Sequence, residues 1–94
     1  MPFQVSWLKR ITPQDGPDLL TFGLTIYVQD PRISVRVERK NNEDDDWILE
    51  ILHSKSTDAG LYECQISTEQ PQIHKIYLSV EGNSINNYYG YKAT

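Results

Sequence analysis

The segment 58–64, with the sequence DAGLYEC, constrains the fold of this chain more than any other stretch. Gly60 suits a turn that needs unusual backbone angles, and Tyr62 stands two residues before Cys64. This spacing is typical of a tyrosine corner, in which the tyrosine hydroxyl bonds to the backbone beside strand F of a sandwich. Far upstream, Trp7 lies in a short alternating run, where a strand C tryptophan would pack against the strand F cysteine. Together these residues predict an immunoglobulin-like β-sandwich of the variable type.

Short runs of alternating apolar and polar side chains fill most of the chain, separated by Gly, Pro, Asn and Asp. Alternation with period two is the strand signal, and no long segment shows the helical period. The stretch between Trp7 and Arg32 has room for strands C′ and C″. This length favours a recognition domain over an intracellular muscle or cytoskeletal module, which stays open as the alternative. We expect an all-β chain with strands at residues 4–11, 18–22, 25–29, 32–38, 47–52, 61–67 and 72–80.

The two ends of the chain set the expected domain boundaries. Only six residues precede Trp7, so a domain with Trp7 on strand C would lack strands A and B. We expect strands C to G of a partial domain at residues 1–82, and a loose tail rather than an eighth strand at residues 83–94. Without strand B, the strand at 47–52 would keep an unpaired edge, and Cys64 would have no disulfide partner. These features predict marginal stability for the chain alone.

A charged contact is expected at one end of the sandwich. Arg32 stands at the start of one strand, and Asp58 lies in the turn before Tyr62. A guanidinium and a carboxylate in these positions can form a bidentate pair that closes the end of the fold. The structural residues that the sequence indicates are therefore Trp7, Arg32, Asp58, Tyr62 and Cys64.

Charge and motifs argue against several classes of function. The formal net charge is −4, whereas a nucleic-acid-binding domain would favour a basic stripe. No run approaches the roughly 20 apolar residues that span a bilayer, and the first residues lack the basic and apolar regions of a secretory signal. The sequence contains no glycine-rich phosphate loop and no zinc-type spacing of Cys and His. We therefore expect no cofactor, no metal, no nucleic acid, no small-molecule substrate and no insertion of this segment into a membrane.

Two local clusters of residues could form a functional site or could have a purely structural role. The acidic run 43–46 could bind calcium, but four consecutive acids lack the interleaved spacing of a chelating loop, which favours a solvated hairpin turn. Cys64 with His53 or His74 could form a thiol–imidazole pair. However, Cys64 lies on the buried phase of its strand, His74 is expected on the outward phase, and His53 lies past the end of a strand. The sequence therefore predicts no enzymatic activity.

Four segments carry a resemblance to a known family: 5–10 (VSWLKR), 19–23 (LLTFG), 45–51 (DDWILEI) and 62–69 (YECQISTE). They resemble the first immunoglobulin domain of the Dpr family, the "defective proboscis extension response" neuronal surface proteins of invertebrates. The step Asp30-Pro31-Arg32 is similar to that of the Dpr-interacting proteins, which share this domain. The resemblance implies a cell-surface, plasma-membrane or extracellular parent protein that acts in adhesion and synapse organisation. It also implies a partner with an immunoglobulin domain, either of the Dpr-interacting type or a second copy of the chain.

The resemblance further implies that partners bind through the sheet of strands G, F, C, C′ and C″. With Trp7 and Cys64 pointing inward, alternate residues of the same strands point outward, including Ser6 and Lys75. We expect Leu8 to form an apolar centre within a polar rim. The expected binding face comprises Leu8, Arg10, Leu20, Phe22, Glu63, Gln65, Ser67 and Tyr77.

The phase of strand C′ stays open at this point. Either Leu20 and Phe22 point outward, or Leu19 and Thr21 do so, because the alternation alone does not fix which set faces the core.

Overall fold

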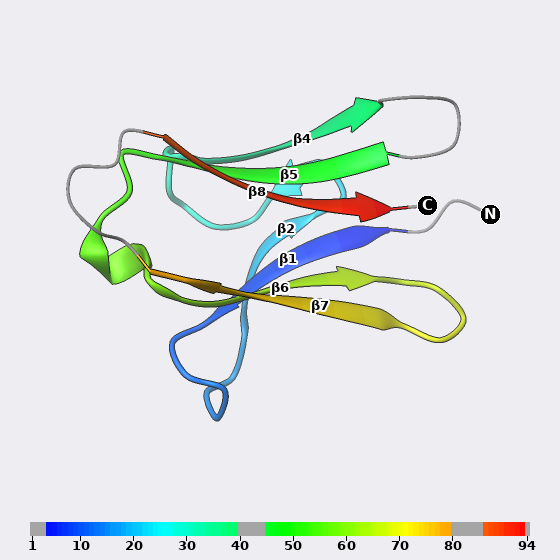
Figure 1. Cartoon of the computed structure of the whole chain (residues 1–94), viewed down its shortest axis with the longest axis horizontal. Helices are drawn as coiled ribbons and strands as arrows, with labels where there is room; N and C mark the ends of the chain where they lie inside the picture. The colour runs from blue at the N-terminus through cyan, green and yellow to red at the C-terminus, as the bar shows by residue number, and fades with distance from the viewer. Residues whose placement is uncertain (1–3, 40–44, 80–85, 94) are drawn as a thin grey trace.

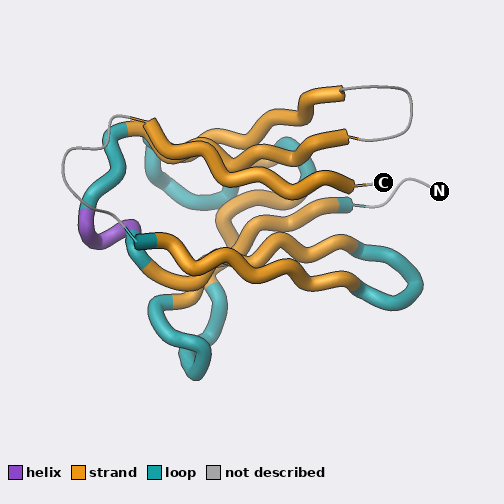
Figure 2. The backbone as a smooth tube through the Cα atoms, in the orientation of Figure 1, coloured by secondary structure: helices purple, strands orange, loops and turns teal. Residues whose placement is uncertain are grey.

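The computed structural model describes residues 4–39, 45–79 and 86–93, and it shows two antiparallel β-sheets packed face to face (Figure 1). The larger sheet has the strand order β3-β2-β1-β6-β7, and the smaller sheet has the order β4-β5-β8. Strands make up nearly all of the regular structure, with one 3₁₀ turn, η1 (Ser56–Asp58), in the described ranges (Figure 2). The strands are β1 (Val5–Arg10), β2 (Asp18–Phe22), β3 (Thr25–Ile26), β4 (Ile33–Arg39), β5 (Asp45–Leu52), β6 (Gly60–Ile66), β7 (Gln72–Leu78) and β8 (Asn86–Ala93).

The strand order matches the expected sandwich. In chain order, β1, β2 and β3 correspond to strands C, C′ and C″, β4 and β5 to D and E, and β6 and β7 to F and G. The expected strand at 25–29 is shorter than predicted, because only Thr25 and Ile26 pair with β2. The other six lie within about two residues of the expected bounds, as strand ends usually do.

The core lies between the two sheets and follows from the alternation. Trp7 and Cys64 are directly opposite each other on β1 and β6, and both are fully buried. The smaller sheet contributes Leu49 and Ile51, which are also fully buried. Burying such side chains is the main stabilising contribution in a domain of this size. The core cluster comprises Val5, Trp7, Leu20, Ile33, Leu49, Ile51, Tyr62, Cys64 and Ile66.

A register shift between β1 and β2 corrects the prediction for strand C′. Leu8 pairs with Leu19 and Trp7 pairs with Thr21, so Leu20 is an extra residue on β2. A bulge of this kind interrupts the alternation of side chains. Leu20 is only 3% exposed and packs in the core, so its expected place on the outward face was wrong.

The C-terminal segment also differs from the prediction. Residues 86–93 were expected to be part of a loose tail, but they form β8, which pairs antiparallel with the whole of β5. The physical reason is that an edge strand presents unpaired N–H and C=O groups that accept another strand. In the immunoglobulin order A-B-E-D this position beside strand E belongs to strand B. The edge of β5 that was expected to be unpaired is therefore covered by β8.

One end of the sandwich is closed by the charged contact that the sequence indicated. Arg32 donates two hydrogen bonds to the carboxylate of Asp58, at 2.8 and 2.9 Å, and two more to Asp30, at 2.9 and 3.2 Å. The hydrogen bonds from Arg32 lower the pKa of both carboxylates, and those same bonds raise the pKa of Arg32. The Tyr62 hydroxyl donates to the carbonyl oxygen of Asp58 at 2.6 Å, which is the geometry of a tyrosine corner.

Gly60 allows β6 to start close to β1. Its φ is +150°, and a Cβ at this position would lie 2.8 Å from the carbonyl oxygen of Arg10. Only glycine accommodates both conditions without a shift of the backbone. The turn therefore sets the register that places Cys64 opposite Trp7.

Candidate protein-binding face

The larger sheet has one side against the core and another that no third layer covers within the described part of the chain (Figure 1). Residues directly opposite one another in antiparallel strands share a face, so the strand register defines this second side. We call it the outer face. It consists of three rows across the sheet, namely Phe22, Ser6, Gln65 and Ile73, then Leu19, Leu8, Glu63 and Lys75, then Arg10, Leu61 and Tyr77.

The outer face carries both covered and exposed apolar side chains. Leu8 and Leu61 are 9% and 2% exposed, yet neither belongs to the core cluster between the sheets. Leu8 therefore points outward as expected, but in the free domain it is largely covered and offers little contact area. The apolar surface comes instead from the more exposed Leu19, Phe22, Ile73 and Tyr77.

An ion pair occupies the middle of the outer face. Nε of Arg10 lies 2.8 Å from Oε2 of Glu63, and the same guanidinium donates to the carbonyl oxygen of Asp15 in the β1–β2 loop. Glu63 was expected to be open to a partner, but the residue is only 3% exposed. The physical reason is that Arg10, far away in the sequence, neutralises and covers the carboxylate.

Lys75 gives the outer face a charge that is not compensated locally. It lies opposite Glu63 in the register and is exposed, while the Glu63 carboxylate bonds to Arg10. Counting Arg10 and Lys75 as positive and Glu63 as negative gives the face a net charge of +1, against −4 for the whole chain. The face is thus more positive than the rest of the molecule.

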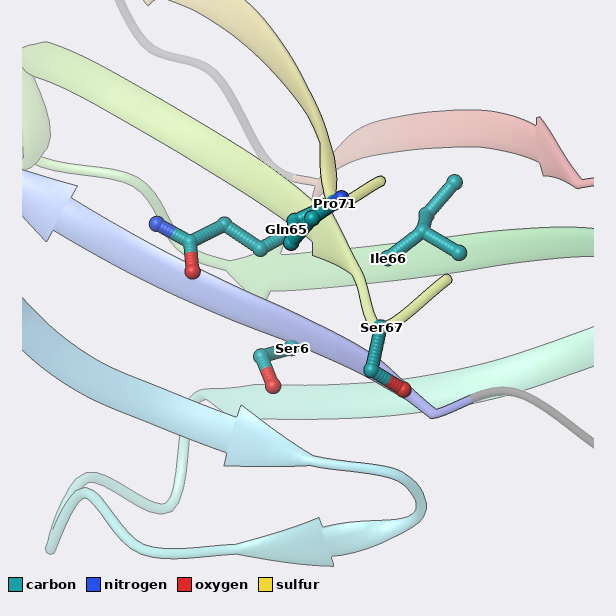
Figure 3. A pocket seen from close by; sticks show the side chains of 5 residues that line it. All are labelled: Ser6, Gln65, Ile66, Ser67 and Pro71. Atoms are coloured by element: carbon teal, nitrogen blue, oxygen red, sulfur yellow. The ribbon is translucent and has the colours of Figure 1, made fainter. Parts of the chain in front are cut away.

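A shallow hollow of about 190 Å³ lies beside the first row of the outer face (Figure 3). Pro71 supplies an apolar wall, while Ser6, Gln65 and Ser67 supply polar groups. The Ile66 side chain belongs to the core and is only 4% exposed. The Ser67 hydroxyl accepts a hydrogen bond from the backbone N–H of Gln4 at 2.8 Å. The Gln65 side chain, by contrast, extends away from Ile66 and the strand axis (Figure 3).

The structure places both members of the possible thiol–imidazole pair, Cys64 and His74, opposite each other on β6 and β7. His74 lies opposite Cys64 in the register, so it shares the inward phase with Ile76 and was wrongly expected to point outward. His74 stands two residues before Ile76 and four before Leu78, so the two-residue period of a strand places all three on the same side. This spacing was the signal that could have shown the inward position of His74. Burial raises the pKa of the Cys64 thiol to about 12, which disfavours the thiolate that a nucleophile requires.

The described residues hold no group of three His, Cys, Asp or Glu that could bind a metal ion. Glu43 and Asp44 of the acidic run lie outside the described residues. Asp45 and Asp46 belong to strand β5 rather than to a turn, and Asp45 pairs with Arg39 at 2.9 Å. In the ranges that the structure describes, no helix is long and apolar enough to cross a membrane.

The arrangement of strands is similar to that of known proteins. No protein-family model matches the chain. Among solved structures, the chain superposes on one chain of the ZIG-8–RIG-5 IG1–IG1 heterodimer with a TM-score of 0.67 at 27% identity, over 87% of this chain and 65% of the other. The chain has an immunoglobulin-like fold. It also superposes on one chain of the complex of Dpr1 IG1 with DIP-eta IG1 (TM-score 0.66, 27% identity, 86% of this chain and 70% of the other) and on one chain of the ZIG-8 IG1 homodimer (TM-score 0.67, 28% identity, 85% and 62%).

One curated protein of similar sequence is the Zwei Ig domain protein zig-8 of Caenorhabditis elegans, which is 29% identical over 77 residues. The match covers 82% of this chain, and the chain spans about a quarter of that relative's length, at 26%. The Dpr likeness is thus accompanied by an equal structural likeness to ZIG-8.

Proposed function

We propose that this chain is a recognition domain of the Dpr type, which binds the immunoglobulin-like domain of another protein or of a second copy through the outer face. The observation that carries the proposal is a sheet side without a covering layer in the described chain, on which Phe22, Ile73 and Tyr77 are 45%, 51% and 71% exposed. Exposed apolar patches of this kind mark interaction surfaces when polar groups surround them.

The chemistry of the outer face suits an interface. Aromatic side chains supply large contact areas, and Phe22 and Tyr77 stand at opposite sides of the face. The Arg10–Glu63 pair is already neutralised within the domain, so covering it adds no uncompensated charge. Gln65 and Ser67 provide polar groups at the edge, as in the rim of a protein–protein contact.

The comparisons support the kind of partner. The solved relatives are pairs of IG1 domains, either two different chains or two copies of ZIG-8. A cell-surface or extracellular place for the parent protein, and a role in synaptic partner choice, are part of the same proposal. The presence of β2 and β3 on the sheet is typical of a variable-type domain, which favours recognition over a cytoskeletal immunoglobulin module.

The experiment measures binding of the 94-residue chain to immobilised RIG-5 IG1, DIP-eta IG1 and the chain itself by surface plasmon resonance. We expect binding to at least one of the three, and a loss of about 30-fold or more when Tyr77→Asp or Phe22→Asp is introduced. Tyr27→Asp is the matched control, because Tyr27 is 57% exposed but lies outside the eleven positions of the outer face.

Two results would contradict the proposal. One is the absence of binding to all three surfaces. The other is an affinity that Tyr77→Asp lowers no more than Tyr27→Asp does, with both variants folded.

A further inference from the structure

The hollow beside Ser6 has a chemical character that points to a particular occupant. Its wall at Pro71 is apolar, but the side chains of Ser6 and Gln65 make no hydrogen bond to another group within the described chain. An aliphatic occupant would cover these polar groups without bonding them, which is unfavourable. An occupant with an apolar ring and a polar tip would satisfy both kinds of lining.

Lys75, which lies near the hollow, sets a second requirement for the occupant, namely a negative charge. Gln65 lies opposite Ile73 in the register, and Lys75 follows two residues later on the same face of β7. Two residues of a strand span roughly 7 Å, so the ammonium group lies within reach of a charge carried beside the occupant. Lys75 has no ion pair within the described chain, whereas the neighbouring Glu63 is already held by Arg10.

A second copy of this chain offers no available carboxylate to pair with Lys75. The one carboxylate on the outer face is that of Glu63, whose side chain is 4% exposed and bonded to Arg10. Two copies facing each other would bring positive faces together without an available carboxylate for Lys75. Charge complementarity therefore favours a different chain as the occupant.

We propose that the hollow is a specificity subsite for a phenol side chain, a tyrosine, on the facing sheet of a different immunoglobulin-like chain, with a carboxylate of that chain paired to Lys75. This inference rests on the proposed function, since it names the partner chemistry of the same face. The tyrosine hydroxyl bonds to Ser6 and Gln65, and its ring packs against Pro71.

The test uses small probes, so that it does not depend on a partner protein. Amide chemical shifts of the ¹⁵N-labelled chain are followed during titration with p-cresol, with 3-(4-hydroxyphenyl)propionate and with tyramine. These three compounds share a phenol and carry no charge, a carboxylate and an ammonium group, respectively. We expect saturable shifts centred on residues 6 and 65–67, and an affinity for the propionate about two- to fivefold higher than for p-cresol, with tyramine weakest.

Variants of the chain make the test specific. Ser6→Leu fills the hollow and should abolish the shifts from all three compounds, and Gln65→Leu should weaken them if Ser6→Leu does not fold. Lys75→Met should reduce the affinity for the propionate to that for p-cresol. Lys55→Met is the matched control, since Lys55 is exposed and lies in the turn before η1, away from the outer face.

Several outcomes would overturn the inference. Shifts that do not saturate, that centre elsewhere, or that persist in folded Ser6→Leu would remove the hollow as a phenol site. An affinity for tyramine equal to that for the propionate would remove the carboxylate pairing with Lys75.

The domain-binding assay separates this inference from the proposed function. If Tyr77→Asp abolishes binding to an immunoglobulin-like partner but Ser6→Leu does not, the outer face stands and the subsite is wrong. If Tyr77→Asp has no effect, the proposed function is wrong whatever the phenol titration gives.

Discussion

Replacing Arg32 by leucine removes the cation that holds one end of the sandwich together. Its guanidinium makes four hydrogen bonds to Asp58 and Asp30 and another, at 3.1 Å, to the carbonyl oxygen of His53. In Arg32→Leu the Asp58 carboxylate, whose side chain is 8% exposed, would keep only the backbone N–H of Lys55 at 2.6 Å. The variant therefore contains a nearly buried carboxylate without its counter-ion.

The expected loss of stability follows from that geometry. Removing one partner of a buried ion pair costs about 3–5 kcal/mol. Arg32 is itself one-fifth exposed, and the bond from Lys55 remains, so we expect about 2–4 kcal/mol. With a urea slope near the lower end of the usual range, about 1.5 kcal/mol/M, the midpoint of unfolding should fall by roughly 2 M.

The loss should also depend on pH in a defined direction. Hydrogen bonding to Arg32 lowers the pKa of Asp58 in the folded wild type, whereas the unfolded chain has a value of about 3.9. The stabilisation is therefore fully present above about pH 4 to 5 and is lost as the pH falls through the folded pKa. The difference between wild type and Arg32→Leu should be largest near neutral pH and should shrink below about pH 4.

Urea unfolding followed by tryptophan fluorescence at several pH values between 3 and 7 measures both effects. Arg36→Leu is the matched control, because Arg36 and Glu38 form an ion pair whose side chains are 45% and 37% exposed. That substitution should cost less than about 1 kcal/mol. A loss below about 1 kcal/mol for Arg32→Leu, or a loss that stays constant from pH 3 to pH 7, would refute the reasoning.

Two further predictions concern Cys64 and β8. Because burial raises the pKa of the Cys64 thiol to about 12, iodoacetamide at pH 8 should modify the folded chain far more slowly than the urea-unfolded chain. Mass spectrometry measures both rates, and equal rates would contradict the burial of the thiol. Ending the chain at residue 82 removes β8 and leaves the edge of β5 unpaired, so the shortened chain should unfold at lower urea and scatter more light as its concentration rises. An unchanged midpoint without added scattering would show that β8 contributes nothing to the sandwich.

The sequence was informative where structure depends on local spacing. The two-residue step from Tyr62 to Cys64 and the glycine before them are properties of one short segment, and the structure contains the tyrosine corner they indicate. The same is true of the alternation that buries Trp7 and Leu49, since the period of a strand is a property of the backbone.

The outer face was predicted less well, because its exposure depends on contacts between distant strands. Leu20 faces the core because the register between β1 and β2 shifts by one residue. Glu63 lies on the predicted phase, but the guanidinium of Arg10 covers it. Neither effect has a signal in the alternation of a single strand.

The sequence by itself determined the fold class, the strands that enclose the core and the residues that close one end of it, because each of these follows from a local pattern. Only the tertiary structure decided that residues 86–93 form β8 and which side chains of the outer face are open to a partner. Those outcomes depend on which edges and charges meet in space. Pairing along β5 and burial of Glu63 both arise only when strands far apart in the chain come together.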